Sequence, residues 1–363
     1  MQTEEHIIRE LFVEQRLAKG LNPDALFEYL VVQGFTPVFL ETVKQLPVVL
    51  PDDFLSRLTA QAREEAVHRL EAMKELNRLA ERFQECGVNA LVLKGAALCL
   101  ADFYQEPGHR PSSDIDLFVA DDDFECVFKI LESIGYIAAP AKGNMLSAAR
   151  IFEKPGRFGL VLNIDLHRRI SNSHHRFAHE MNFERLMAGG RCVQQGIWVP
   201  SPMHMLLHAG FHRAQHFNHM GDRLIWLYDV HLLTEAMDDA QILEALEVAR
   251  DLDVYDMVLA SLAAAQFYFP SRHEGLVGDV LQDEPDRSGY VADSFFFNLA
   301  SIPKLSGRVR FVLQTLFPGP RYLMWDKSAA WYELPSLYLQ RWWLALKMLS
   351  LAVRSRLSKR AIS

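Results

Sequence analysis

Residues 88–119 read VNALVLKGAALCLADFYQEPGHRPSSDIDLFV, and this stretch decides the fold. Its apolar run 88–93 predicts a short strand, and the alanine- and leucine-rich run 96–104 predicts a helix. Residues 105–113 contain two prolines and a glycine, so we expect a loop there. A second strand is expected over 115–119, within SDIDLFV. A strand, a helix and another strand in so short a stretch indicate an α/β unit.

Further β-rich runs extend this unit over residues 85–200. A strand pair is expected over 158–167 (FGLVLNIDLH) and a short strand over 192–199. The acidic run Asp121–Asp123 is expected to cap a helix over 124–134, because negative charge favours the positive end of a helix. Short strands therefore alternate with helices through this region.

The two flanks show the three- and four-residue apolar spacing of helices. We therefore expect an α+β fold, mostly helical overall, with a small mixed β-sheet core between helical flanks. The predicted regions are an N-terminal helical region (1–84), the α/β core (85–200) and a C-terminal helical region (201–363).

Composition excludes several classes of protein. The chain has 38 basic and 46 acidic residues, a formal net charge of −8 and a pI near 6.0. This balance argues against a protein that coats nucleic acid through its general charge. The N-terminus, MQTEEHIIRE, lacks the basic and apolar runs of a signal peptide, so a cytoplasmic location is expected. The four cysteines show no metal-site spacing and are expected to be reduced and mostly buried.

The late apolar run 342–353 (WWLALKMLSLAV) is shorter than the roughly 20 residues of a membrane span. We expect it to form a buried helix, and we expect no membrane partner. The aromatic runs Phe295–Phe297 and Trp342–Trp343 are interpreted as core or interdomain packing. The basic end 354–360 (RSRLSKR) is interpreted as a solvated terminal helix rather than a binding arm.

Three aspartates suggest a metal site. Asp114 and Asp116 stand two residues apart on an expected strand, so their side chains face the same side. Carboxylates buried that close together repel each other unless a cation neutralises them, and Mg²⁺ or Mn²⁺ suits hard oxygen ligands. Asp165 lies on another expected strand and supplies a third carboxylate if the two strands are neighbours. The sequence therefore predicts a two-metal site for phosphoryl or nucleotidyl transfer, with all three aspartates as metal ligands and catalytic residues.

A predicted phosphate-binding turn precedes these aspartates. Lys94 and Gly95 follow the first strand, where glycine lets the backbone approach a phosphate and the N-terminus of a helix attracts anions. Lys94 and Arg110 are predicted to bind phosphate oxygens as charges, and a nucleoside triphosphate is the predicted substrate. The alternatives stay open: an exposed lysine at a strand end, and a solvated acidic edge strand for Asp114 and Asp116.

Here the sequence resembles a known family. The segments LVLKGAALCLADFY (91–104), RPSSDIDLFV (110–119) and NIDLH (163–167) resemble polymerase-β-type nucleotidyltransferases. They are most similar to an uncharacterised bacterial branch with K-G, D-I-D-L and I-D-L-H motifs. The likeness continues through SPMHMLLHAGFH (201–212) and RLIWLYDV (223–230).

The resemblance implies that Asp114 and Asp116 hold metal, that Asp165 is the third carboxylate, and that Gly95 marks the nucleotide-phosphate turn. Many relatives place Ser or Thr shortly after this glycine, where this chain has Ala96 and Ala97.

The helix expected after Ser201 carries a histidine at every fourth residue from His204 to His216. No H-E-x-x-H motif accompanies them and the spacing drifts around a helix, so packing against the core is favoured over a transition-metal site. Asp229 is expected to be a buried structural partner of Arg223 or a histidine, or else a general base. The residues assigned to the acceptor side or to structure are His167, His208, His212, Arg223 and Asp229.

The predicted function is metal-dependent transfer of an NMP from an NTP to an acceptor hydroxyl, with release of pyrophosphate. The acceptor is a small molecule, a protein or an RNA, and the sequence does not distinguish them. Two alternatives remain: a catalytically decayed nucleotidyltransferase fold that acts as a binding module, and a D-x-D glycosyltransferase. The second is disfavoured because its larger donor-binding domain should precede the D-x-D motif, whereas strands here begin only at 88–93.

Overall fold

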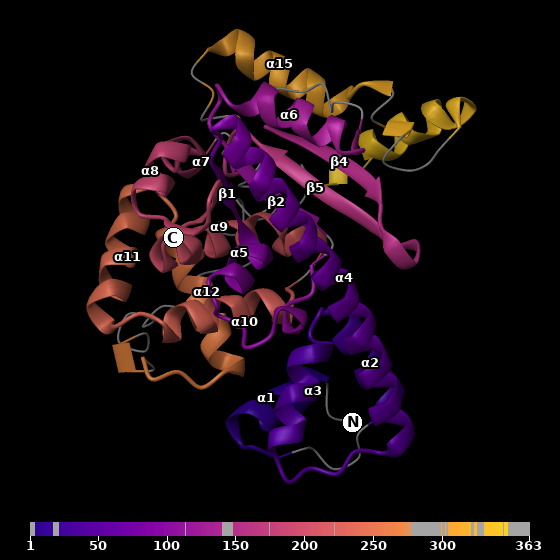
Figure 1. Ribbon diagram of the computed structural model, residues 1–363, viewed down its shortest axis with the longest axis vertical. Coiled ribbons are helices and arrows are strands. Elements are labelled where there is room, and N and C mark those ends of the chain that lie inside the picture. The colour runs from indigo at the N-terminus through magenta and orange to yellow at the C-terminus, as the bar shows by residue number, and fades with distance from the viewer. Residues whose placement is uncertain are drawn as a thin grey trace.

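The computed structural model in Figure 1 shows a mixed sheet with helices on both sides of it. The described residues are 4–16, 22–112, 114–139, 148–173, 175–220, 222–273, 275–276, 299, 302, 304–320, 323–324, 330–343 and 345–347.

Seven strands of these described residues form one sheet, in the order β3-β4-β5-β2-β1-β7-β6. Strands β2 and β5 are parallel, as are β1 and β7, whereas every other neighbouring pair is antiparallel. The expected α+β fold with a mixed sheet is thereby confirmed. The strand bounds are β1 (Ala90–Val92), β2 (Asp114–Val119), β3 (Ile137–Ala138), β4 (Ala149–Pro155), β5 (Val161–His167), β6 (Arg191–Gln194) and β7 (Ile197–Val199).

The N-terminal helices rest on one long helix. Helix α4 has 35 residues and is about 52 Å long at 1.5 Å per residue, and α2 and α3 contact it. It ends at Gly87, whose φ of 67° lies in the left-handed region that glycine adopts without steric cost. Figure 1 shows α4 running from these N-terminal helices up to the sheet. The bounds are α1 (Glu4–Val13), α2 (Pro23–Val32), α3 (Thr36–Gln45) and α4 (Asp52–Cys86).

The helices after the sheet form the wall that faces the site. Helix α9 packs against α10, α11 and α12 and also contacts α5. In Figure 1, α6 and α15 lie above the sheet, whereas α9, α10 and α12 lie below it. The bounds are α5 (Lys94–Leu100), α6 (Phe124–Ser133), α7 (Arg176–Glu180), α8 (Phe183–Ala188), α9 (Pro202–Met220), α10 (Leu224–Glu235), α11 (Asp239–Asp251), α12 (Tyr255–Tyr268) and α15 (Leu305–Leu316), with 3-10 turns η1 (Pro107–His109), η2 (Arg157–Gly159) and η4 (Trp331–Glu333).

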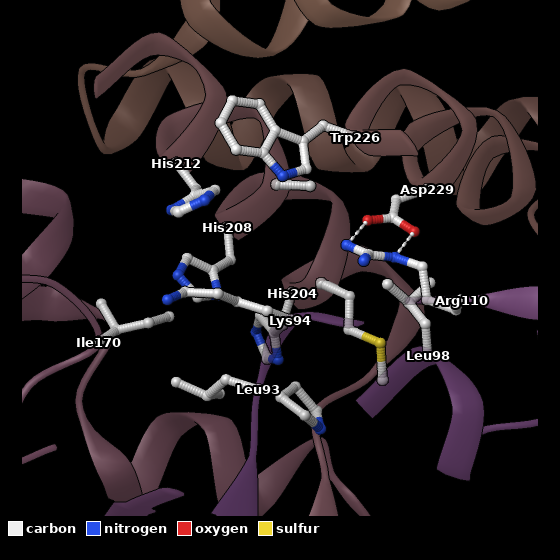
Figure 2. A pocket seen from close by; sticks show the side chains of 13 residues that line it. Leu93, Lys94, Leu98, Arg110, Ile170, His204, His208, His212, Trp226 and Asp229 are labelled. Carbon is white, nitrogen blue, oxygen red and sulfur yellow. Dashed lines mark hydrogen bonds and ion pairs between the residues drawn. The ribbon is translucent and has the colours of Figure 1, made fainter. Parts of the chain in front are cut away.

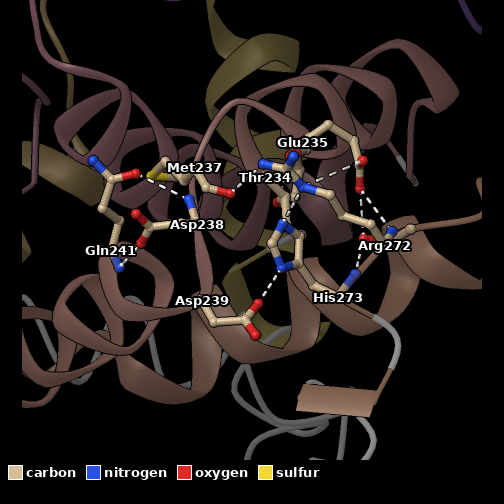
Figure 3. Close-up of polar contacts among 10 residues, drawn as sticks. Thr234, Glu235, Met237, Asp238, Asp239, Gln241, Arg272 and His273 are labelled. Atoms are coloured by element: carbon tan, nitrogen blue, oxygen red, sulfur yellow. Dashed lines mark hydrogen bonds and ion pairs between the residues drawn. The ribbon is translucent and has the colours of Figure 1, made fainter.

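Polar contacts fasten the segment after α12 to the corner between α10 and α11, as Figure 3 shows. The His273 ring bonds to Asp239, and the Ser271 hydroxyl donates to Glu235 at 2.6 Å. Arg272 donates through Nη2 to the carbonyl of Met237, two residues after the end of α10, and through Nε to His273. With both ring nitrogens of His273 engaged, this cluster is a structural clamp that holds α10 in place.

Several local expectations were wrong. The residues 149–155 form β4, a strand that the sequence did not signal. The single strand expected over 192–199 is a hairpin of β6 and β7 that turns at Gly196, where φ is +83°. Asp123 occupies the N-cap of α6 but makes no side-chain capping hydrogen bond, so the acidic run acts at most through its charge.

The described residues of the late apolar run, 342–343 and 345–347, are helical but not buried as expected. Trp343 is 65% exposed and Leu346 is 66% exposed, so the expectation of packing for this aromatic pair fails at Trp343. Phe295–Phe297 and residues 354–360 lie outside the described residues. The described residues include all four cysteines and show no disulfide, but Cys86 and Cys192 are exposed, against the expectation of mostly buried thiols. Within the described chain no helix is long and apolar enough to cross a bilayer.

Candidate active site

The in-register pairing of β2 with β5 builds the centre of the site. These strands run parallel, with Asp116 opposite Asp165 and Asp114 opposite Asn163. Side chains that pair across a parallel ladder point to the same face, and the alternate residues Ile115 and Leu117 are buried on the other face. The strand sequences therefore gather carboxylates on one side and core residues on the other.

Asp116, Asp165 and His167 form the group best suited to a metal ion. One potential ligand atom from each residue lies within 4.8 Å of the other two. His167 Nε2 is 2.9 Å from Asp116 Oδ1, and its Nδ1 is buried with no partner within the described chain. Two carboxylates and an imidazole are ordinary ligands for divalent ions, so the residues present fit such a group.

Asp114, two residues before Asp116 on β2, lies outside this group. Its carboxylate accepts a hydrogen bond from the Ser112 hydroxyl at 3.1 Å. Burial, with the neighbouring Asp116 charge, raises its pKa. The role of Asp114 as a metal ligand therefore stays a prediction, while His167 takes the place beside Asp116 and Asp165.

Lys94 neutralises the buried carboxylate of Asp116. Its Nζ donates to Asp116 Oδ1 at 2.6 Å. Lys94 adopts φ +52°, a left-handed conformation that costs a non-glycine residue on the order of 1 kcal/mol, and the ion pair offsets this cost. Burial opposes the charge of Lys94, but Asp116 and Asp114 raise the pKa of the lysine above its ordinary value, so it stays protonated.

The pKa values of Asp116 and Asp165 are shifted in opposite directions. Burial alone would raise the pKa of Asp116, but the Lys94 ammonium and the hydrogen bond from His167 hold it well below its usual value. Burial and the Asp116 charge raise the pKa of Asp165 to about 6. Within the described residues no ion pair neutralises Asp165, so burial and the Asp116 charge disfavour its charged form, and a bound cation would stabilise that form.

Arg110 and Asp229 form a buried pair beside this group. Arg110 Nε donates to Asp229 Oδ1 at 2.8 Å and Nη2 donates to Oδ2 at 2.6 Å, while the Tyr104 hydroxyl donates to Oδ1 at 2.7 Å. Arg110 Nη1 donates to the carbonyl of Pro111. The partner of Asp229 is therefore Arg110 with Tyr104, and not Arg223 or a histidine. With its nitrogens engaged in this way, Arg110 is placed as a wall of the site, and its phosphate role stays a prediction.

Gly95 is required by the same pair. A Cβ at this position would lie 2.8 Å from Arg110 Cζ, closer than real contacts allow. The glycine of the expected phosphate turn therefore has a packing role that its sequence context did not reveal.

Helix α4 also reaches the Arg110–Asp229 pair, because the buried Arg69 Nε donates to the Arg110 carbonyl at 3.1 Å.

A pocket of about 50 Å³ opens beside Lys94, and Figure 2 shows its lining. The pocket is lined by His208 and His212 from α9, by Trp226 from α10, and by the Arg110–Asp229 pair. Burial and the Lys94 ammonium lower the pKa of His208 to about 3 and also lower that of His212, so both rings are neutral near pH 7. The pocket therefore offers neutral imidazoles next to an ammonium group.

The other predicted residues lie around this pocket without joining the metal group. His204 also lines it, and the His212 and His216 rings are 4.4 Å apart on successive turns of α9. Arg223 precedes α10, with its guanidinium 5.6 Å from the Trp226 ring. His204, His208 and His212 thus line the pocket, and none of the α9 histidines joins the metal group. Tyr104 was missed, because nothing in the sequence identifies the partner of a buried hydroxyl.

A family model described as uncharacterised nucleotidyltransferase matches residues 19–270, and the chain belongs to this family. The resemblance inferred from the motifs is thereby confirmed.

Two other comparisons complete the picture. A solved structure described as an antigenic nucleotidyltransferase-like protein from Paracoccidioides brasiliensis is 14% identical, with a TM-score of 0.33, over 56% of this chain and 95% of that chain. No curated protein matches the chain. The assignment therefore rests on the family match.

Proposed function

We propose that this protein is a metal-dependent nucleotidyltransferase that moves an NMP from an NTP to an acceptor hydroxyl and releases pyrophosphate. The observation that carries the proposal is the in-register pairing of Asp116 with Asp165, which brings two carboxylates and His167 within 4.8 Å. Buried like charges are costly, so a protein retains such a group where a bound cation offsets the repulsion.

Asp116, Asp165 and His167 would hold the ion, with Asp114 on the same strand as Asp116 as a further carboxylate. Bound Mg²⁺ or Mn²⁺ would supply positive charge to the α-phosphate and would lower the pKa of an acceptor hydroxyl.

In the proposed mechanism Lys94 supplies a positive charge that can turn from Asp116 to a substrate phosphate. Its side chain is protonated, and Nζ stands 2.6 Å from Asp116 Oδ1. The ammonium can exchange the carboxylate for a phosphate oxygen without changing its protonation state. It would then stabilise the charge that builds up on departing pyrophosphate.

The pocket beside Lys94 is the proposed acceptor side. His208 and His212 are neutral near pH 7, so either ring can accept a hydrogen bond from an acceptor hydroxyl. Trp226 gives the acceptor an apolar surface, and the rigid Arg110–Asp229 pair fixes the opposite wall. The acceptor itself is a small molecule, a protein or an RNA.

A second candidate function is a decayed fold that binds a partner without catalysis. The observations that favour it are the ion pair of Lys94 with Asp116, which already satisfies this carboxylate, and the buried Ala96 and Ala97 after the glycine. Such a protein would bind no nucleotide in a metal-dependent manner.

The deciding experiment is incubation with NTPs labelled at the α-phosphate, together with Mg²⁺ and a cell extract. We expect labelled acceptor with wild type and at least a hundredfold less with Asp116→Asn or Asp165→Asn. The matched control is Asp121→Asn, which changes an exposed aspartate in the turn after β2 and should retain labelling.

A parallel reaction uses NTPs labelled at the γ-phosphate. Transfer of the γ-label without transfer of the α-label would show that the reaction is that of a kinase. The absence of labelling, together with no Mg²⁺-dependent thermal stabilisation by any NTP, would support the decayed fold instead.

A further inference from the structure

Helix α15 presents an apolar stripe to solvent. Four apolar residues recur at every fourth position and are between 52% and 76% exposed, which is the reverse of an amphipathic core helix. Four-residue steps turn about 40° each, so the side chains stay on one slowly turning face. The stripe consists of Leu305, Val309, Leu313 and Phe317.

A second stripe lies on the helical residues 334–343 and 345–347. Leu339, Trp343 and Leu346 follow one another at spacings of four and three residues, and each is more than 60% exposed. Trp331 and Tyr332 of η4, just before this helix, are more exposed still. Exposed apolar groups of this size and number are rarely left without a partner.

The two stripes belong to one packed unit. Side chains of the second helix donate hydrogen bonds to the end of α15, so both helices are fixed while their apolar faces stay open. These bonds are Tyr338 Oη to the Pro318 carbonyl at 2.7 Å, Arg341 Nε to the Thr315 carbonyl at 2.6 Å, and Trp342 Nε1 to the Leu316 carbonyl at 2.9 Å.

The charge of this part of the chain is opposite to that of the rest. Residues 304–363 contain 11 basic and 2 acidic residues, a net charge of +9, whereas the whole chain carries −8, so residues 1–303 carry −17. Within the described part, Lys304 and Arg310 lie exposed on or beside α15 and Lys347 lies exposed beside Trp343. Apolar stripes are thus edged with positive charge.

We propose that α15 and the helical residues 334–343 and 345–347 dock onto an anionic lipid surface. Interfacial helices combine an apolar face of Leu, Phe and Trp with flanking Lys and Arg, and they lie in the plane of the membrane without crossing it. Each basic residue near the surface adds attraction to anionic headgroups. A nucleic acid would match the charge but would gain nothing from an exposed stripe of Leu and Val, which favours the lipid surface.

This proposal differs from the expectation of no membrane partner. That expectation rested on the short length of the run 342–353, and length bears on crossing a bilayer rather than on lying at its surface. The exposed fractions of Leu313 and Trp343, which sequence alone could not give, supply the new argument.

The test is flotation of the full-length protein with vesicles of phosphatidylcholine containing 30% phosphatidylglycerol, compared with pure phosphatidylcholine. We expect binding to the anionic vesicles and at least about tenfold weaker binding to the neutral ones, and we expect 0.5 M NaCl to release the protein. Val309→Asp/Leu313→Asp and, separately, Arg310→Gln/Lys347→Gln should each weaken binding by about tenfold or more.

The matched control is Leu243→Asp, which changes an exposed apolar residue on α11 away from the stripes and should bind like wild type. Arg310 and Lys347 are both exposed, so Arg310→Gln/Lys347→Gln should fold. This variant keeps the test valid even if Val309→Asp/Leu313→Asp unfolds. The proposal is overturned by equal binding of all variants, by equal binding to both kinds of vesicle, by heparin or RNA binding without vesicle binding, or by a dimer that buries the stripes in solution.

Discussion

Replacing Asp229 by alanine would leave the Arg110 guanidinium buried without its carboxylate. Arg110 is 6% exposed and Asp229 is 5% exposed, so water cannot take over the lost contacts. The variant removes two charged hydrogen bonds from Arg110 and one from Tyr104. Breaking a buried pair in this way costs about 3–5 kcal/mol, so we expect the free energy of unfolding in urea to fall by this amount.

A matched surface pair separates this effect from a general loss of charge. Glu125 bonds to Arg168 at 2.8 Å, but both side chains are largely exposed, so Glu125→Ala should cost less than about 1 kcal/mol. The double variant Arg110→Met/Asp229→Leu removes both charges and should recover a large part of the loss. A loss below about 1 kcal/mol for Asp229→Ala, or no recovery in the double variant, would refute the reasoning.

Three further predictions concern the residues around this pair. The folded state holds a proton on Asp165 up to a pH of about 6, whereas the ordinary pKa of an aspartate is 3.8. This group therefore makes the free energy of unfolding fall by about 2 kcal/mol as pH rises from 4 to 6. In Asp165→Asn this contribution should be absent, so the melting temperature should change less over this range than in wild type. Lys94→Met leaves the Asp116 carboxylate buried without its ammonium and should cost about 1–3 kcal/mol in urea unfolding at pH 7, a loss absent when Asp116→Asn is combined with it. Gly95→Ala forces a methyl group against Arg110 and should lower stability by about 1–3 kcal/mol; an unchanged unfolding midpoint would show that Arg110 moves away freely.

The core of the fold was predictable because its pattern is local. The strand at β2, with alternate carboxylates and apolar residues, and the Lys–Gly turn before it can be read within one stretch of 32 residues. The helix α6 was likewise signalled by short-range features.

The rest of the fold depends on contacts between distant residues. The strand β4 (ARIFEKP) lacks a clear alternation, so its identity comes from pairing with β5 rather than from its own residues. The exposure of Trp343 is a tertiary property, because the same apolar spacing describes a buried helix and a docking face.

The site shows the same division. The sequence placed Asp116 and Asp165 on strands but could not give the parallel register that joins them. It also could not identify the partner of Arg110, whose guanidinium is bound by Asp229, 119 residues away. Sequence gives the inventory of charges, and the packing decides which of them neutralise each other.

The length of α4 has a mechanical consequence. This single helix joins the N-terminal helices to the loop that carries Arg110, where Arg69 grips the Arg110 carbonyl. Arg69 lies near the middle of α4, 17 residues or about 26 Å from its start at 1.5 Å per residue. A tilt of α4 that follows a movement of α2 and α3, which contact it, would therefore displace the Arg110 carbonyl and with it one wall of the pocket.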